Sequence, residues 1–291
     1  MKQGVQAMNR YKTIESMKSH IDGARAEGKK VGFVPTMGAL HPGHASLIAL
    51  ASESCDEVVV SVFVNPTQFN SKEDFETYPL TLQGDLNLAR LAGATVVFTP
   101  TVEALYGTSL AVKPVDYGRL TSVYEGQKRK GHFDGVVAVV RKLFSAVNAH
   151  RAFFGEKDLQ QLAVIRRLAQ EEFADLEVIG CPLVRESDGL AMSSRNARLS
   201  ELLRQDALAL YDWLNQIKNA VRGTTDVSAL LTAIEAEANS MTHVELEYVD
   251  VVNAKTFEPL RKTCDAEDAF AIVAAEVGGV RLIDNCRLAC S

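Results

Sequence analysis

Two histidines, His41 and His44, stand three residues apart in the tetrad His-Pro-Gly-His. An apolar run from Val31 to Val34 precedes them, and its shortness and flanking charges are typical of a buried strand in a parallel sheet. An apolar helical pattern begins at Ala45, so the tetrad falls where a helix starts. Free N–H groups and the positive end of the helix dipole meet at such a turn, which makes it the usual anion site of an open α/β sheet. The two imidazoles therefore predict a site at which both face one phosphate.

An H-x-G-H tetrad after a buried strand resembles the signature of the nucleotidyltransferase superfamily, whose members act at the α-phosphate of ATP. Taken alone, the tetrad also fits two solvent-facing turn histidines or a metal-binding pair. Zinc usually takes three or four protein ligands, and no cysteine or aspartate cluster lies near the tetrad. Metal binding is therefore the weaker interpretation.

A second turn of this kind follows a short predicted strand over residues 151–154. Its residues, Gly155, Glu156, Lys157 and Asp158, open a predicted helix, and the Lys157 ammonium is placed where it could meet ATP phosphates. The two acids suit the N-terminus of any helix, so the tetrad alone also fits a simple cap. The chain contains neither a G-x-x-x-x-G-K-[ST] loop nor a G-x-G-x-x-G turn, which weakens the P-loop and dinucleotide alternatives.

Two further loops follow predicted strands. Residues 65–69 come after the β-branched run Glu57–Val64, and in a parallel sheet they fall on the same rim as the histidines. Residues 185–196 come after the predicted strand Glu177–Val184 and are rich in hydroxyls, glycine and arginine. That composition predicts a mobile loop with hydrogen-bond donors and one arginine guanidinium, whose paired N–H groups and positive charge suit phosphate. It also fits a linker between domains, and both can hold.

The elements alternate as strand and helix up to about residue 184, which predicts an α/β fold with a Rossmann-like doubly wound parallel sheet. Helices expected near residues 201–221 and 227–240 precede strands near 244–252, 269–274 and 281–283, a pattern typical of a smaller C-terminal α+β domain. We expect the domains to be residues 1–184 and 185–291. The first ten residues are expected to be an extension outside the fold, with Met8 as an alternative start.

Composition restricts the class of protein. The chain has 291 residues, 47% hydrophobic and 23% charged, as in globular proteins. A formal charge of −6 without a basic block makes a nucleic-acid partner unexpected. The five cysteines form no C-x-x-C pair, and their odd number indicates reduced thiols in a cytoplasmic protein. No stretch predicts a membrane span or a signal peptide.

Five motifs occur in register with a known family. They are PTMGALHPGH, FVNPTQF, GHFDGVVAVVRKLF, FFGEKDLQQL and DGLAMSSRN, and the tail VRLIDN follows. With these the sequence closely resembles the pantoate–β-alanine ligases (pantothenate synthetases) from about Val31 to Arg198. The resemblance implies a homodimer of chains with a Rossmann-like domain and a C-terminal lid. It also implies that ATP and Mg²⁺ adenylate (R)-pantoate with release of pyrophosphate, and that β-alanine then attacks the pantoyl-adenylate to give pantothenate and AMP.

The resemblance also carries over site residues. The implied catalytic residues are His41, His44, Lys157, Ser193, Ser194 and Arg195, with His44 as the proton donor. The implied ATP contacts are Met37, Gly38, Ala39, Leu40, His41, Pro42, Gly43, His44, Gly155, Glu156, Lys157, Asp158, Val184, Met192, Ser193, Ser194 and Arg195. Gln68 and Gln161 are implied for pantoate, Gln68 also for β-alanine, and Arg129 and His132 match further polar positions.

Three positions depart from the family pattern. Leu80 stands where arginine is frequent, Lys130 where proline is frequent, and Gly84 where some members carry an extra acid. The last leaves the protein ligands of Mg²⁺ unknown, with Asp85 as a candidate only, since phosphates supply most of that ion's ligands.

The chemistry suits these residue types. An anionic carboxylate must approach an anionic phosphate, so donors aimed at the growing negative charge stabilise the transition state more than the ground state. Neutral glutamines fix pantoate without a tight ion pair, and we expect the Ser193–Arg195 loop to close over ATP and exclude water. The alternatives are a nucleotidyltransferase that stops at a nucleotide-linked product and a nucleotide-binding module without turnover. The presence of His44, Lys157 and Arg195 disfavours the second.

Overall fold

A computed structural model describes residues 8–221, 226–261 and 268–288. The chain forms two compact units. The first runs to Glu156 and resumes from Val164 to Pro182, and the second comprises Lys157–Ala163 and the chain from Leu183 onward. Each unit has its own sheet.

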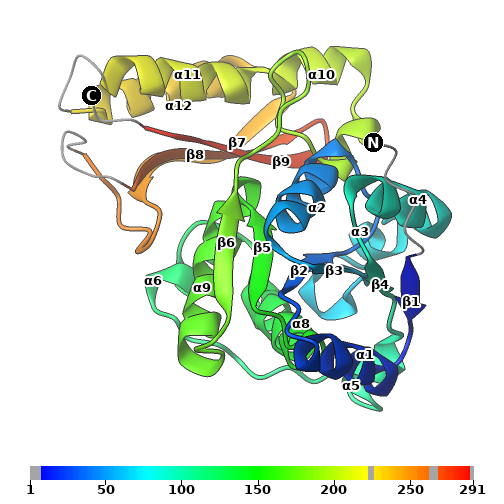
Figure 1. Ribbon diagram of the computed structural model, residues 1–291. Helices are drawn as coiled ribbons and strands as arrows, with labels where there is room; N and C mark the ends of the chain where they lie inside the picture. The colour runs from blue at the N-terminus through cyan, green and yellow to red at the C-terminus, as the bar shows by residue number, and fades with distance from the viewer. Residues whose placement is uncertain (1–7, 222–225, 262–267, 289–291) are drawn as a thin grey trace. The chain divides into compact units, whose positions relative to one another are not determined.

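The first unit is built on a six-stranded sheet in the order β1-β4-β3-β2-β5-β6, with every neighbouring pair parallel (Figure 1). From β2 the chain adds β3 and β4 on one side, and β5 and β6 on the other. This confirms the predicted Rossmann-like sheet, and it makes the gap between the ends of β2 and β5 the point where the winding reverses. The strands are β1 (Asn9–Tyr11), β2 (Val31–Thr36), β3 (Glu57–Val62), β4 (Val96–Phe98), β5 (Arg151–Gly155) and β6 (Glu177–Cys181).

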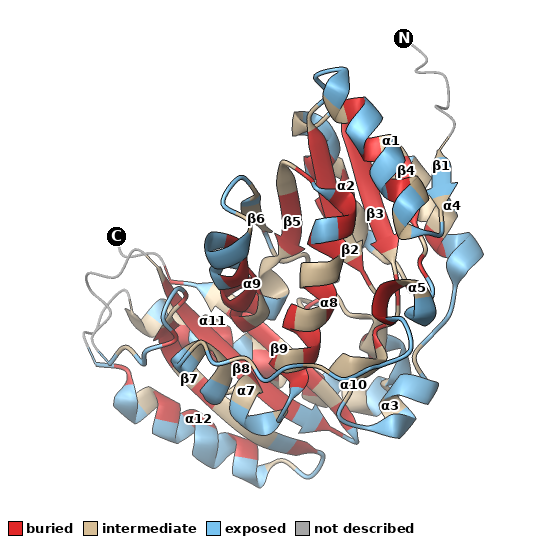
Figure 2. Ribbon diagram, turned by 90° about the horizontal axis from the view of Figure 1, so that it is seen from below, coloured by how far each residue is buried: buried red, intermediate tan, exposed pale blue. Residues whose placement is uncertain are grey.

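Helices cover both faces of this sheet. On one face α2 and α4 pack over alternate strand residues such as Val34, Val60 and Phe153. On the other face α1 and α8 pack together, and Phe144 of α8 meets the rings of Phe33 and Phe154 edge-on. The inner strands β2, β3, β4 and β5 are largely buried, whereas the edge strand β1 is mostly exposed (Figure 2), as expected for a parallel sheet covered on both faces. The helices of this unit are α1 (Ile14–Ala26), α2 (Pro42–Ser54), η1 (Pro66–Gln68), α3 (Lys72–Glu76), α4 (Leu82–Ala92), α5 (Val102–Tyr106), α6 (Arg119–Ser122), α7 (Glu125–Lys128) and α8 (His132–Val147). Two more, η2 (Glu156–Asp158) and α9 (Leu159–Glu172), have residues in both units.

The prediction that the first ten residues lie outside the fold was wrong for the last two of them. Asn9 and Arg10 belong to β1, which pairs with β4 at the edge of the sheet. Three residues carry too little periodicity to reveal an edge strand, and pairing with a distant strand decides it. The predicted last strand was also too long, because β6 ends at Cys181.

The second unit packs helices on an antiparallel sheet in the order β7-β8-β9. Trp213 is fully buried on α11, among core residues of α12 and the three strands. The predicted helix over residues 201–221 is two helices that meet at Leu208. The elements are η3 (Ser194–Arg198), α10 (Glu201–Ala207), α11 (Ala209–Val221), α12 (Ser228–Ser240), β7 (Val244–Asn253), β8 (Ala269–Val277) and β9 (Val280–Arg287).

Candidate active site

The two histidines form a reciprocal cap at the start of α2. His41 is the N-cap residue, and its Nδ1 accepts the N–H of Gly43 at 3.2 Å. The Nδ1 of His44 accepts the N–H of His41 at 3.3 Å, and the ring centroids lie 4.1 Å apart. A nitrogen that accepts a hydrogen bond carries no proton, so each neutral ring holds its hydrogen on Nε2. The cap thus orients two N–H donors at a helix N-terminus, where anions bind.

The turn before this cap is held by a buried carboxylate from α4. Asp85 is 2% exposed, and it accepts Ala39 N–H at 3.2 Å and Leu40 N–H at 2.8 Å. Gly38 and Ala39 both have left-handed backbone angles, with φ of 88° and 48°. At the other end of the turn, the Thr36 hydroxyl accepts the N–H of Gly38 and donates to a main-chain carbonyl of β3. The turn is therefore tied at both ends.

Gln68 lies in η1, and its amide is oriented by Asn65. Asn65, 1% exposed, donates from Nδ2 to Gln68 Oε1 at 3.0 Å, and its own Oδ1 accepts the hydroxyls of Thr67 and Tyr106. With the oxygen occupied, the Gln68 amide group points Nε2 at Met37 Sδ, 2.9 Å away. A thioether is a weak acceptor, so the structure brings two predicted site residues together through a bond that a better acceptor would replace.

α8 packs directly against this loop. A Cβ on Gly135 would lie 2.2 Å from the carbonyl oxygen of Thr67, so only glycine permits the contact. The ring of His132, 6% exposed, places Nδ1 2.9 Å from the carbonyl oxygen of Gln68. A carbonyl only accepts, so Nδ1 carries the proton, the opposite tautomer to His41 and His44. Arg129 lies 3.6 Å from the buried Glu125 carboxylate.

The second predicted turn follows β5. Gly155 is the last residue of β5, which pairs in parallel with β2, so the two strands end on the same rim of the first unit. Lys157 comes two residues later in η2 and belongs to the second unit. There the side chain of Asn285 donates to the carbonyl of Lys157 at 2.9 Å. The Lys157 ammonium lies 3.9 Å from Asp158, and its side chain is 21% exposed. The half-buried Gln161 is in the first turn of α9.

The predicted loop over residues 185–196 is tied down within the second unit. Met192 N–H donates to Val184 O, and Arg185 and Ala191 form a bridge between them. The two Nη atoms of Arg185 bind the buried Asp284 at 2.6 and 3.0 Å, and Arg195 is the loop arginine that the resemblance assigns to ATP.

Ser193 caps η3 and accepts Arg195 N–H at 3.2 Å, and Ser194 begins that helix. Both serines and Arg195 are half-buried. These residues stand where the resemblance assigns ATP contacts, and the fold of the second unit holds them in one short segment.

Sequence reasoning gave no role to Asn65, Asn285 or the Arg185–Asp284 pair. The only local signal was Asn-Pro at a strand end, which marks Asn65 as a turn residue. Asp284 and Asn285 were noted within the tail motif, but their partners lie 99 and 128 residues away along the chain. Among the departures, Leu80 is 82% exposed, and Lys130 and Gly84 are also exposed.

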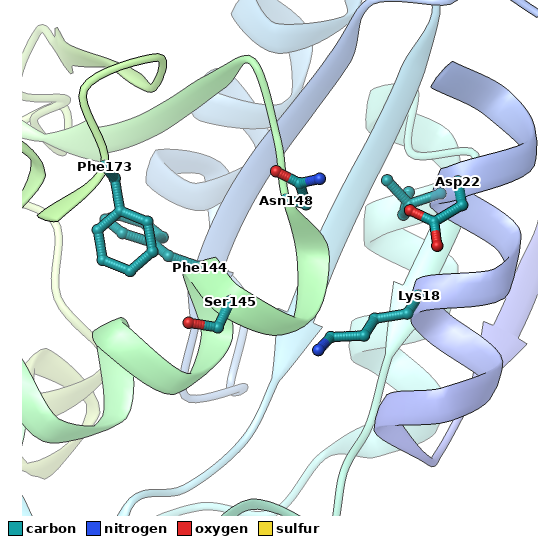
Figure 3. Close-up of a pocket in the computed structure, with 7 residues that line it drawn as sticks. Lys18, Asp22, Phe144, Ser145, Asn148 and Phe173 are labelled. Carbon is teal, nitrogen blue, oxygen red and sulfur yellow. The ribbon is translucent and has the colours of Figure 1, made fainter. Parts of the chain in front are cut away.

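A separate pocket of about 280 Å³ lies between α1 and the end of α8. Lys18 and Asp22 extend into it from α1, and Ser145 and Asn148 border it on the other side (Figure 3). Asn148 precedes β5, so this pocket is at the amino ends of the strands, away from the histidine turn. In the part of the chain that the structure describes, no three His, Cys, Asp or Glu side chains gather as a metal site, and no helix is long and apolar enough to cross a membrane.

A Rossmann-like sheet with a histidine-capped helix N-terminus at its switch point is the arrangement of an α/β enzyme that binds a nucleotide. Comparison with known proteins narrows this class. The family model described as pantoate-beta-alanine ligase matches residues 9–287. The chain belongs to this family of ligases, which use ATP to join pantoate and β-alanine through a pantoyl-adenylate, forming pantothenate, AMP and pyrophosphate.

Relatives and solved structures agree with this membership. The chain is 49% identical to the pantothenate synthetase of Rubrobacter xylanophilus over 91% of this chain and 93% of that one. A Bacteroides fragilis pantothenate synthetase is 44% identical over 94% of this chain and 97% of its own length. A pantothenate synthetase structure from Thermus thermophilus matches with a TM-score of 0.89 at 39% identity, covering 97% and 99%. A Francisella tularensis pantoate-beta-alanine ligase, complexed with "Beta-gamma ATP" and β-alanine, matches with a TM-score of 0.79 at 32% identity, covering 96% and 97%.

Proposed function

We propose that the residues named above divide the ligase reaction between nucleotide activation and pantoate binding. The N–H groups of His41 and His44 contact the phosphates of ATP, with His44 the main donor to the α-phosphate in the transition state. Lys157, Ser193, Ser194 and Arg195 add donors as charge grows on the α-phosphate and on the departing pyrophosphate. Donors that meet charge only as it develops lower the barrier without tightening the ground state.

The observation that carries this proposal is the tautomer of the capped histidines. The main chain occupies Nδ1 of both rings, so each presents an Nε2–H without needing a second proton. His44 in this state acts by hydrogen bonding, and the helix cap rather than the substrate fixes its orientation.

Gln68 is proposed to bind pantoate and then to meet β-alanine. Its amide N–H group donates to the Met37 sulfur in this structure, and would donate to a hydroxyl or carboxylate oxygen of pantoate when that substrate is bound. Asn65 holds the amide in that orientation beforehand, so little side-chain freedom is lost on binding. Gln161 is proposed as the second amide for pantoate.

Mg²⁺ is proposed to enter with ATP, as part of the substrate, with phosphate oxygens as its main ligands. The one carboxylate that the sequence offered, Asp85, does not fit as a ligand, because main-chain N–H groups and a hydroxyl occupy its oxygens. No step above depends on a protein ligand to the ion.

A homodimer and a C-terminal lid over residues 185–291, beside an ATP- and pantoate-binding domain over residues 1–184, come from the resemblance. The cytoplasmic location is supported by Cys55, Cys181 and Cys286, which are all free thiols. Sedimentation equilibrium tests the dimer: a single species near 31.7 kDa at micromolar concentration would contradict it.

The assignment is tested by ATP–pyrophosphate exchange. We expect exchange only when pantoate is present, followed by stoichiometric AMP release when β-alanine is added. Exchange that does not depend on pantoate would contradict the substrate assignment. AMP release that does not depend on β-alanine would indicate hydrolysis rather than ligation.

A further inference from the structure

Asp85 is a buried charge with an unusual set of partners. Its Oδ1 accepts Leu40 N–H at 2.8 Å and the Thr81 hydroxyl at 3.0 Å, and its Oδ2 accepts Ala39 N–H at 3.2 Å. The residue is 2% exposed. A carboxylate so far from water is stable only when such donors replace its hydration.

The donors come from a strained turn. Ala39 has φ of 48°, a conformation that costs a non-glycine residue roughly 1 kcal/mol or more. Two successive N–H groups point in one direction from such a turn and form an anion-binding concavity. Without the carboxylate, the N–H groups of these two half-buried residues would lose the acceptor that the fold provides. The hydrogen bonds to Asp85 therefore stabilise the turn in a conformation that is otherwise unfavourable for Ala39.

The geometry also leaves little room for a cation. A Cβ built on Gly38 would lie 3.0 Å from Oδ2, so the turn covers that oxygen closely. Oδ1 already accepts two hydrogen bonds. Mg²⁺ keeps several waters and needs near-octahedral space around it, which a carboxylate with 2% exposure does not offer.

The turn leads directly into the histidine cap, since Leu40 is followed by His41. We propose that Asp85 is a positioning residue: it holds the Gly38–Leu40 turn so that His41 and His44 present their N–H donors, and it does not ligate Mg²⁺. This inference rests on the proposed role of the histidines in ATP binding. The structural part of the inference, that Asp85 holds the Gly38–Leu40 turn (the locked turn), does not depend on that role.

The test compares Asp85→Asn with the wild-type enzyme in pantoate-dependent ATP–pyrophosphate exchange over a range of free Mg²⁺. An amide keeps the size of the side chain but turns an N–H₂ toward one of the main-chain N–H groups, so the turn must shift. We expect kcat to fall roughly 10- to 100-fold, as for misplaced catalytic groups, while the Mg²⁺ concentration for half-maximal rate stays within about twofold of wild type. Asp22→Asn, an exposed acid on α1, serves as the matched control and should behave as wild type.

Two results would overturn the inference. A Mg²⁺ requirement raised tenfold or more, with activity restored at high Mg²⁺, would make Asp85 a metal ligand. Wild-type kcat in Asp85→Asn would remove its positioning role. If the asparagine variant does not fold, Thr81→Val makes the same comparison. It deletes one of three donors and should lower kcat less than tenfold without changing the Mg²⁺ requirement.

Amide hydrogen exchange separates this inference from the proposed function. In wild type, Ala39 and Leu40 should be protected, and in Asp85→Asn at least one of them should exchange at least tenfold faster. Equal protection in both proteins would contradict the locked turn. Protection lost as expected, together with no pantoate-dependent exchange in the wild-type enzyme, would leave the turn intact and overturn only the proposed function.

Discussion

The N–H of His41 donates to Nδ1 of His44 over 3.3 Å, so the imidazole at the predicted phosphate site also caps the helix that carries it. One ring nitrogen caps the helix, and the other is the one that we propose to donate to ATP. This division makes the two functions separable by mutation, because asparagine and glutamine each resemble one half of the ring.

His44→Asn keeps an acceptor near the position of Nδ1 and loses the Nε2–H. His44→Gln has the reverse effect. We expect the asparagine variant to lose roughly 10²–10³ in adenylation rate at near-normal thermal stability. The glutamine variant should retain more activity and lose about 1 kcal/mol of stability, the usual value of a cap. Pantoate-dependent exchange and chemical denaturation measure the two effects, and near-normal exchange in His44→Asn would remove His44 from its role.

Gly135→Ala should displace the loop that carries Gln68. The added methyl group would lie 2.2 Å from the Thr67 carbonyl oxygen, and neither backbone can yield without moving η1. We expect a loss of about 1–3 kcal/mol in stability and a KM for pantoate raised at least tenfold, measured by denaturation and by exchange.

The matched control for this substitution is Gly23→Ala in the exposed part of α1, where an added Cβ meets nothing within 4 Å. Alanine is the better helix former, so we expect a gain of roughly 0.5–1 kcal/mol with unchanged kinetics. Equal stability of the two alanine variants would show that α8 and η1 are not packed as described.

Arg185→Lys should destabilise the second unit. Its guanidinium binds Asp284, 4% exposed, at two points, donates to the carbonyls of Gly189 and Asn285, and stacks 4.5 Å from the ring centroid of Tyr211. A lysine cannot make this set of contacts, and a poorly paired buried carboxylate costs roughly 3 kcal/mol.

Arg141→Lys is the control, because Arg141 binds Glu172 through two equally short contacts at an exposed position. Such pairs contribute at most about 1 kcal/mol. Urea denaturation should therefore show a clearly larger loss in the free energy of unfolding for Arg185→Lys than for Arg141→Lys. A loss of similar size in both would show that burial of Asp284 does not decide the effect.

His150 should make stability depend on pH. Burial lowers the pKa of His150 below its usual range, and the charges of Arg25 and Lys30 lower it further. Its Nδ1 accepts Val31 N–H at 2.9 Å, a bond that protonation of that nitrogen would break. The unfolded chain therefore binds this proton more readily. Neutral His150 therefore makes its full contribution to the free energy of unfolding above pH 6.5, which is about the pKa of histidine in the unfolded chain. That contribution is lost as the pH falls below this value.

His150→Asn keeps an acceptor near Nδ1 and removes the titrating group. We expect the free energy of unfolding to fall less between pH 7 and pH 5 than in wild type, measured by urea denaturation at each pH. An identical pH dependence in the two proteins would contradict the assignment.

Much of the site was predictable from local sequence. The apolar run before Pro35, the proline at the first position of α2 and the pattern from Ala45 place a strand, a turn and a helix start, and the structure has each of them. The alternation of strands and helices likewise predicted the parallel sheet. These features depend on periodicity and caps, which neighbouring residues decide.

The tertiary structure alone decided what each polar group binds. Asp85 lies 46 residues from Ala39 along the chain, and Arg185 binds Asp284, 99 residues away. Asn65, which orients Gln68, also donates to the carbonyl of Gly135 in α8, 70 residues away. The proton position on His132 follows from such a partner, the carbonyl of Gln68, and not from residue type. Hydrogen bonds and burial join residues that are distant in sequence, and the spacing along one chain carries no record of that pairing.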